Sequence, residues 1–252
     1  MLLLKKISLS AIILLTVLSS MAQPVRVAVA ANAQFVVQKL ASDFKKKTGI
    51  TVEVISGASG KLAAQIKQGA PYDIFLSADM NFAQSVYNDG LALNQPKIYA
   101  LGSLVVCSTT GADLKNWKSY ITNHSPGKIA IGNPEVAPYG KAAKEALTHF
   151  GLYEAASDRL VFAESISQVN TYVLKGVVNI GFTTASLVYE LNPVGSFKWE
   201  KVDPAAYAPI EQGAVLLKYA KNKNFVNNKR FFDYLFSADA KATFRQFGYI
   251  IT

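Results

Sequence analysis

Short apolar runs alternate with longer amphipathic stretches along most of this 252-residue chain. Runs rich in Val, Ile and Ala predict buried strands, and stretches with apolar residues three or four positions apart predict helices. The expected strands are 25–30, 51–55, 73–76, 104–107, 128–131, 160–162, 179–183 and 213–217. The expected helices are 35–47, 61–67, 81–88, 117–120, 139–150, 166–174, 224–236 and 238–247. This alternation predicts an α/β protein with largely parallel sheets.

The stretch that contains Pro193, Pro204 and Pro209 interrupts this pattern. Proline has no backbone N–H and disrupts helices and central strands. We therefore expect irregular structure there, before the final strand and the two C-terminal helices.

The N-terminus has the pattern of a secretory signal peptide. Lys5 and Lys6 precede the apolar stretch 7–17, and small residues lead to Ala22, which predicts that residues 1–22 are removed on export. The alternative is an N-terminal membrane anchor, which needs about 18 uninterrupted apolar residues. Hydroxyl residues interrupt the apolar core here, so we expect a mature protein that is free in the periplasm.

Composition is that of a globular chain, with 50% hydrophobic and 17% charged residues. The formal charge of +9 falls to +7 once the two leader lysines, Lys5 and Lys6, are removed. Such a balance suits an anionic ligand, an anionic membrane or nucleic acid. The lysines are scattered except at 45–47, and an exported protein rarely meets nucleic acid, so no nucleic-acid partner is expected. The single cysteine, Cys107, is expected to be an inert core residue.

Patterns typical of catalysis do not occur. His124 and His149 have no neighbouring ligands at metal-binding spacing, so we expect no protein-bound metal. The segment 57–62 lacks the spacing of a nucleotide P-loop, and no nucleophile elbow is present. Asp73 and Asp79 are expected to have capping or turn roles. The sequence therefore predicts neither an enzyme nor a cofactor.

Four junctions, in contrast, join an apolar strand to a helix through a short polar or glycine-containing turn. Helix N-termini carry unpaired N–H groups and partial positive charge, so several of them together can bind an anion. Taken singly, Asn32, Ser59 and Ser165 could be ordinary N-caps. Together the junctions favour a ligand cleft at the carboxyl ends of the strands. They lie at 31–33, 56–60, 137–140 and 164–167.

At these residues the chain resembles the periplasmic molybdate-binding proteins, from about Val25 to the C-terminus. The matching stretches are 27–32, 56–62, 69–79, 132–135, 138–140 and 244–250. The resemblance implies a type II periplasmic binding protein fold, in which two lobes are joined by two crossovers and enclose a ligand cleft. With the element order, it places lobe I at 23–101 plus 214–252 and lobe II at 102–213, with crossovers near Gly102 and Gly213.

The resemblance also implies the ligand positions. The residue after the opening strand is Asn32, and the serine of the second junction is Ser59. The third contact, at the start of the helix after the Pro-Glu loop, falls on Tyr139, and a fourth, backbone contact falls on Ile166. Some family members add a tyrosine where this chain has Thr183 and Thr184, which leaves a fifth contact open.

These four positions suit molybdate, a tetrahedral dianion whose oxygens only accept hydrogen bonds. None of them is Asp or Glu. Phosphate keeps a proton at neutral pH and benefits from an acceptor, whereas sulfate differs mainly in its smaller size. We expect a monomeric binding protein that captures molybdate or tungstate and delivers it to an ABC permease and its ATPase. The alternatives are a receptor for sulfate or phosphate, a secreted hydrolase, and a periplasmic sensory or scaffold module.

Overall fold

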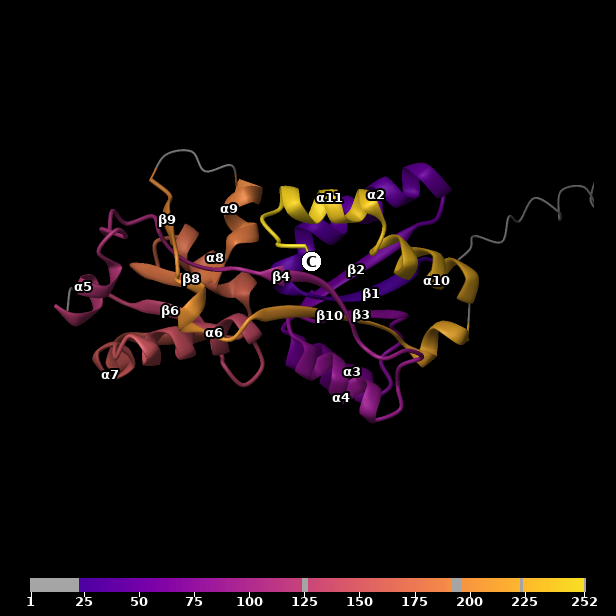
Figure 1. Cartoon of the computed structure of the whole chain (residues 1–252), viewed down its shortest axis with the longest axis horizontal. Coiled ribbons are helices and arrows are strands. Elements are labelled where there is room, and N and C mark those ends of the chain that lie inside the picture. The colour runs from indigo at the N-terminus through magenta and orange to yellow at the C-terminus, as the bar shows by residue number, and fades with distance from the viewer. Residues whose placement is uncertain (1–22, 124–126, 192–195, 223, 252) are drawn as a thin grey trace, which may run out of the picture.

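The computed structural model describes residues 23–123, 127–191, 196–222 and 224–251, which form two α/β lobes along the long axis (Figure 1). Lobe I contains a five-stranded sheet of order β2-β1-β3-β10-β4. Its strands are β1 (Val25–Ala30), β2 (Val52–Gly57), β3 (Ile74–Leu76), β4 (Lys97–Gly102) and β10 (Ile210–Leu216). Its helices are η1 (Ala31–Ala33), α2 (Gln34–Thr48), α3 (Ser59–Lys67), α4 (Met80–Asn88), η4 (Lys218–Lys221), α10 (Phe225–Tyr234) and α11 (Ala238–Gln246).

Lobe II contains a second five-stranded sheet, of order β7-β6-β8-β5-β9. Its strands are β5 (Leu104–Ser108), β6 (Ile129–Gly132), β7 (Leu160–Ala163), β8 (Ile180–Thr184) and β9 (Lys198–Lys201). Its helices are α5 (Trp117–Thr122), α6 (Pro138–His149), α7 (Tyr153–Ala156), η2 (Ser157–Arg159), α8 (Ile166–Leu174), α9 (Ala185–Leu191) and η3 (Pro204–Ala206). The α/β class and the two-lobed architecture expected from the sequence are confirmed.

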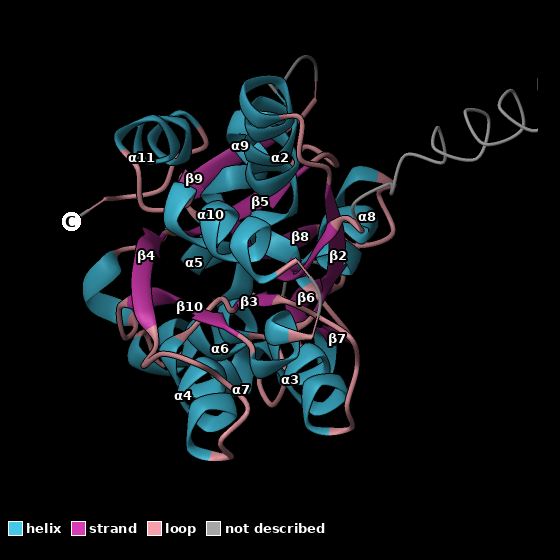
Figure 2. Cartoon of the chain, turned by 90° about the vertical axis from the view of Figure 1, so that its right-hand side faces the viewer, coloured by secondary structure: helices cyan, strands magenta, loops and turns pink. Residues whose placement is uncertain are grey.

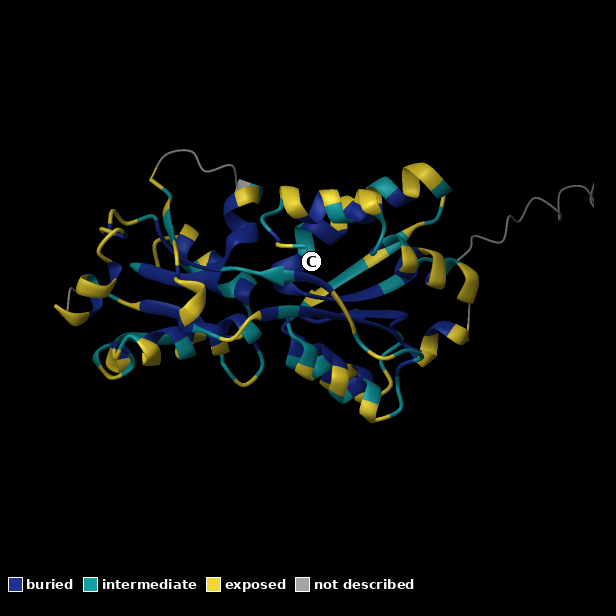
Figure 3. Cartoon of the chain, viewed as in Figure 1, coloured by how far each residue is buried: buried dark blue, intermediate teal, exposed yellow. Residues whose placement is uncertain are grey.

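Helices cover both faces of the lobe I sheet. Figure 2 shows α3 and α4 on one side of it, and α2, α10 and α11 on the other. Separate apolar clusters fill these two spaces, around Phe75 on one side and Phe231 on the other. Burial follows both sheets through the molecule, while the outer faces of the helices are exposed (Figure 3). Strands covered on both faces are continuously apolar, which is why they were readable in the sequence.

Each sheet contains one reversed strand. In lobe I, β1 is parallel to β2 and β3, whereas β10 is antiparallel to its neighbours β3 and β4. In lobe II, β6 is parallel to β7 and β8, and β5 is antiparallel to β8 and β9. The reversed strands are those that enter from the other lobe. The sheets are therefore largely parallel, as predicted, with the exceptions confined to the crossovers.

The two crossovers meet at a hinge. Ser103 alone separates β4 of lobe I from β5 of lobe II, and the returning chain enters β10 at Ile210. Gly102 and Ile210 are paired across the antiparallel β4–β10 ladder. Residues 210–213 thus pair within the sheet of lobe I, ahead of the boundary predicted after residue 213. Short, hydrogen-bonded joints of this kind suit a hinge between two rigid bodies.

Several short elements escaped the sequence pattern. The expectation of irregular structure between β8 and β10 is wrong in part, because α9 and β9 form there; Pro193 itself lies outside the described residues. The pattern also missed β4 and α7. β9 lies at the edge of its sheet, and β4 and β9 alternate only weakly between buried and exposed positions. Their structure depends on pairing with distant strands, which local periodicity does not record.

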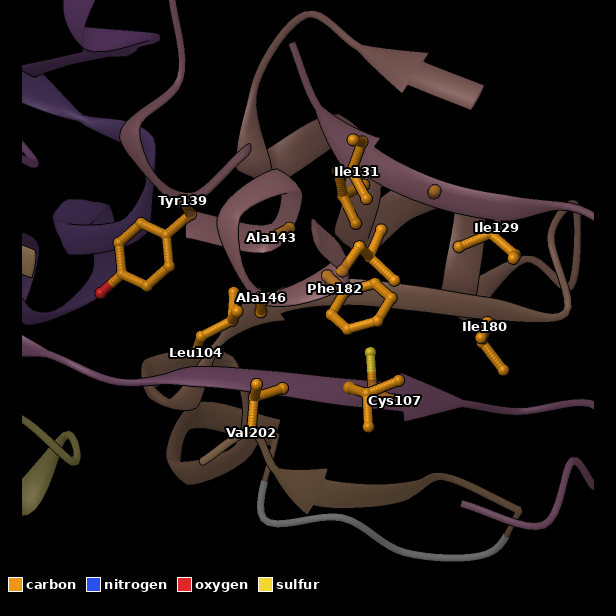
Figure 4. Packing of buried hydrophobic residues seen from close by; sticks show 14 of the residues in the cluster. Leu104, Cys107, Ile129, Ile131, Tyr139, Ala143, Ala146, Ile180, Phe182 and Val202 are labelled. Atoms are coloured by element: carbon orange, nitrogen blue, oxygen red, sulfur yellow. The ribbon is translucent and has the colours of Figure 1, made fainter. Parts of the chain in front are cut away.

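Cys107 lies in the core of lobe II, as predicted. It is fully buried beside Phe182 and Ile180 (Figure 4). Burial raises the pKa of its thiol to about 12, so the thiol stays protonated and unreactive. His149 is exposed, as expected, whereas His124 and the predicted leader 1–22 lie outside the described residues. None of the helices in the described ranges is long and apolar enough to cross a membrane.

The two aspartates considered in the sequence have different roles. Asp79 caps α4 by accepting a hydrogen bond from the Phe82 amide at 3.0 Å, as expected. Asp73 is no cap, because its buried carboxylate ties β1 to α10. It accepts hydrogen bonds from the Arg26 amide at 2.8 Å and from the Asn228 side chain at 3.0 Å. Burial raises the pKa of Asp73, and the Arg26 amide offsets part of this rise.

Replacing Asp73 should therefore destabilise lobe I. Asp73→Ala removes hydrogen bonds to a charged group and leaves buried donors exposed to an apolar side chain, which should lower the free energy of unfolding by about 1.5–3 kcal/mol. Asp233→Ala is the control, because Asp233 forms an exposed ion pair with Lys229 that is worth at most about 0.5 kcal/mol. Urea titration measures both. Equal losses in the two variants would show that Asp73 is not a structural tie.

Candidate ligand site between the lobes

A small cavity of about 10 Å³ lies between the lobes. That volume is near the minimum that holds one water molecule, so the lobes are closed against each other. Asn32, Ser59, Tyr139 and Ile166, the four positions selected from the sequence, all contribute to its wall. Its remaining lining residues are Ala30, Ala31, Gly57, Ala58, Ala78, Ala137 and Pro138. Among the described residues that form the wall, none has a carboxylate or a cationic side chain.

Helix N-termini from both lobes point at this cavity. Ser59 is the first residue of α3 in lobe I, Ile166 is the first residue of α8 in lobe II, and Tyr139 is the second residue of α6. Amides in the first turn of a helix have no intrahelical acceptor. Each helix adds partial positive charge at this end. Such a convergence can attract an anion without any formal cation, which makes this cavity the candidate site.

Glycine and proline fix the start of α6 against the cavity. Pro138 occupies the first helical position, where its missing N–H costs nothing. A Cβ on Gly140 would lie only 2.0 Å from the Gly132 carbonyl oxygen, so only glycine lets α6 begin directly on the end of β6. The backbone at Tyr139 is therefore held firmly in the cavity wall.

Ser59 is positioned to donate its hydroxyl hydrogen. Its side chain is buried, and its oxygen accepts a hydrogen bond from the Ala78 amide at 2.9 Å. Because that bond occupies an acceptor lone pair, the hydroxyl hydrogen remains available. The simpler N-cap interpretation does not apply, since the N-cap residue of α3 is Ala58. It does apply to Ser165, which caps α8 by accepting from the Gln168 amide.

Asn32 is placed in the wall, but its side chain is turned to the hinge. Its amide nitrogen donates to Gln212 at 2.8 Å and to the Tyr249 hydroxyl at 3.0 Å, which uses both of its hydrogens. Its backbone carbonyl accepts from Tyr249 and from Ser186, both at 2.7 Å. The donor that Asn32 can offer to a ligand is therefore its backbone N–H, and its side chain organises the hinge.

Sequence reasoning missed the residues that support the site. Gln212 is fully buried at the hinge end of β10, and its amide nitrogen also donates to the Ala78 carbonyl at 3.1 Å. Tyr249 lies in the matching C-terminal stretch, but no role was assigned to it. The available signal for Gln212 was its position as a polar residue directly before the apolar strand expected at 213–217. Ser186 follows β8 and carried no signal.

Three contacts join the lobes around the cavity. The Gly60 N–H donates to the Val136 carbonyl at 3.0 Å, and Lys61 forms an ion pair with Glu164 at 2.5 Å. The third is the bond from the Ser186 hydroxyl to the Asn32 carbonyl. Two hydrogen bonds and one exposed ion pair between the described parts of the two lobes thus hold the closed arrangement.

Thr183 and Thr184, considered for a fifth contact, point elsewhere. The Thr183 hydroxyl donates to the Asn170 side chain, and the Thr184 hydroxyl bonds to Ser186. Neither residue belongs to the cavity wall. Both are buried in the interior of lobe II and its contact with α9.

A larger groove of about 990 Å³ lies between α4, α6 and η3. Its wall mixes carboxylates, such as Asp79 and Glu145, with cations, such as Lys141 and Lys144. A dianion would meet repulsion as well as attraction there. The small cavity between the helix N-termini is therefore the better candidate site.

Comparison with known proteins agrees with this geometry. The model of the bacterial extracellular solute-binding protein family matches residues 25–250. The molybdate-binding protein ModA of Rhodobacter capsulatus is 35% identical over 88% of this chain and 86% of its own length. ModA of Azotobacter vinelandii is 32% identical over 92% and 91%. The solved periplasmic molybdate-binding protein of A. vinelandii superposes with a TM-score of 0.84 at 31% identity, covering 90% of this chain and 99% of that one.

A fold of two lobes with a cavity between them, lined by helix N-termini, is the architecture of a periplasmic binding protein. The chain belongs to the bacterial extracellular solute-binding proteins. The type II fold expected from the sequence is confirmed by the superposition. Proteins of this family bind solutes without catalysis or a cofactor, which supports the expectation that the chain is not an enzyme.

Substitution of Ser59 tests the site directly. Ser59→Ala removes one hydrogen bond to a charged ligand and should weaken tetrahedral oxyanion binding about 10- to 100-fold. Ser59→Asp should weaken it further, because a carboxylate would face a dianion in a closed cavity. Calorimetric titration with molybdate measures these effects.

The matched control is Ser165→Ala, which removes the cap of α8 but no cavity residue. It should cost about 1 kcal/mol of stability and leave affinity nearly unchanged. Tight binding by Ser59→Asp would rule out the site.

Proposed function

We propose that the chain captures molybdate, or the closely similar tungstate, and delivers it to an ABC importer. The observation that carries the proposal is the composition of the cavity wall, which offers N–H and O–H donors from both lobes and no carboxylate. A fully deprotonated tetrahedral dianion needs donors only. The relatives named as molybdate-binding proteins, at 32% and 35% identity, support the same ligand.

Asn32, Ser59, Tyr139 and Ile166 are the proposed ligand residues. Ser59 contributes its hydroxyl, and the backbone N–H groups of all four residues, which lie in the first turns of η1, α3, α6 and α8, are the other proposed donors. Burial raises the pKa of the Tyr139 hydroxyl well above its usual range, so it remains neutral beside an anion. The ligand thus bridges the lobes, and its binding favours the closed form over the open one.

The cellular setting follows from the family. The protein acts outside the cytoplasm, and we propose that residues 1–22 are the export signal and that the mature chain begins at Gln23. It works as a monomer with two rigid units, 23–101 plus 214–252 and 102–213, and residues 210–213 move with the first unit because they pair with β4. The closed form is presented to a membrane permease with its ATPase.

Titration calorimetry with four oxyanions tests the proposed ligand. Molybdate and tungstate should bind one per chain, and sulfate and phosphate should bind at least about tenfold more weakly, which corresponds to about 1.4 kcal/mol. Phosphate lacks an acceptor for its proton in this cavity, and sulfate is smaller. A protein that binds sulfate or phosphate more tightly than molybdate would be a receptor for that anion instead.

The pH dependence of binding gives an independent test. Of the described residues in the cavity wall, only Tyr139 is ionisable, and burial raises the pKa of its hydroxyl, so none of these side chains titrates near neutrality. Molybdate affinity should therefore stay constant between about pH 6 and 9. A change of tenfold or more within that range, measured by calorimetry in buffers of matched ionic strength, would reveal a titrating group in the site.

A further inference from the structure

Tyr139 connects the cavity to the hinge. Its backbone lies at the start of α6 in the cavity wall, and its fully buried ring belongs to the apolar cluster of lobe II. Figure 4 shows the hydroxyl oxygen at the far end of the ring, pointing towards the segments of lobe I. There it lies against the hinge strand β4, because a Cβ on Gly102 would be only 2.0 Å from the Tyr139 oxygen.

The groups around this hydroxyl come from both lobes. Asn32 and Tyr249 approach it from lobe I, and Thr184 and Tyr207 approach it from lobe II. The Thr184 and Asn32 side chains lie near enough to lower its pKa, against the larger rise caused by burial. Neither side chain forms a hydrogen bond with the Tyr139 oxygen. Within the described residues the Tyr139 oxygen has no hydrogen-bond partner at all.

The neighbouring buried tyrosines differ in this respect. The Tyr249 hydroxyl donates to the Asn32 carbonyl at 2.7 Å. The Tyr99 hydroxyl is within 3.4 Å of both the Ser77 carbonyl and the Gln212 side-chain oxygen. The donors and acceptors of the hinge are thus occupied by each other, and Tyr139 is left out of their network.

We propose that the unpaired Tyr139 hydroxyl opposes lobe closure and so keeps the empty protein open and speeds ligand release. The reasoning rests on the proposed function, because it concerns closure around the oxyanion. A buried hydroxyl without a partner loses its hydrogen bonds to water and gains none in return. Because its surroundings belong to two lobes and the hinge, separating the lobes lets water reach it. Closure therefore has a free-energy cost, the burial of an unpaired hydroxyl, and the free energy gained from the ligand contacts must be larger than this cost.

Tyr139→Phe tests this inference, because it removes the hydroxyl while keeping the ring and the backbone N–H that faces the cavity. The variant should bind molybdate about 5- to 100-fold more tightly, the range expected when an unsatisfied buried polar group is removed. Most of the gain should appear as slower release, measured by stopped-flow displacement with excess tungstate. Its ligand-free form should also be more compact than the wild type in small-angle X-ray scattering.

Two tyrosine variants provide controls. Tyr219→Phe alters an exposed residue outside the hinge and should leave affinity and release unchanged. Tyr249→Phe removes a hydroxyl that is bonded to Asn32 and should weaken binding instead. Opposite signs for Tyr139→Phe and Tyr249→Phe would distinguish an unpaired hydroxyl from a general effect of removing polarity at the hinge.

The outcomes separate the two hypotheses. A wild-type protein that binds none of the four oxyanions would overturn the proposed function. Wild-type binding together with unchanged or weaker binding by Tyr139→Phe would overturn this inference alone. A Tyr139→Phe protein that folds less stably than the wild type, by thermal melting of the ligand-free form, would also contradict it, because that loss would mean that the hydroxyl has a partner.

Discussion

The architecture depends on neutralising an anion without a cation. A lysine or arginine in a closed cavity would itself need a counter-charge when the ligand is absent. Helix N-termini avoid this problem, because their partial charges are fixed in the backbone and carry no net charge. This solution constrains the fold, because the first turns of α3, α6 and α8 must all lie around one cavity. The two sheets, their parallel strands and the close packing of Gly140 on Gly132 all serve that convergence.

The hinge solves a second problem, which is to hold polar groups in the interior while two bodies move. Asn32, Gln212 and Tyr249 bond to one another from the opening strand, the returning crossover and the C-terminal segment. Buried polar groups that are fully paired define one arrangement of the chain. This network belongs to lobe I, and Ser186 from lobe II adds to it only through the Asn32 carbonyl. Opening of the lobes would therefore break one hydrogen bond of this network and leave the others in place.

Much of the fold was accessible from the sequence, because continuous apolar strands such as Val25–Ala30 and Leu104–Ser108 are buried on both faces. The four wall residues came from a resemblance, supported by the recurring junctions, and the structure brings them together. The direction of the Asn32 side chain was not predictable, because it is decided by Gln212, 180 residues away. β9 and α9 were missed for the same reason, since distant partners rather than local periodicity determine them.

Affinity and release place opposite demands on such a cavity. A wall that offers hydrogen-bond donors and, among the described residues, no carboxylate favours a dianion, and a cavity of about 10 Å³ leaves room for little competing water. A receptor that delivers its ligand to a permease must also release it. Release is easier when the closed form without ligand contacts has a higher free energy than the open form. Direct hydrogen bonds between the lobes, such as that from the Gly60 N–H to the Val136 carbonyl, favour closure. Opening therefore requires some interaction that makes the closed form less favourable. The proposed source of this opposing free energy is the buried Tyr139 hydroxyl beside the hinge, which has no hydrogen-bond partner among the described residues.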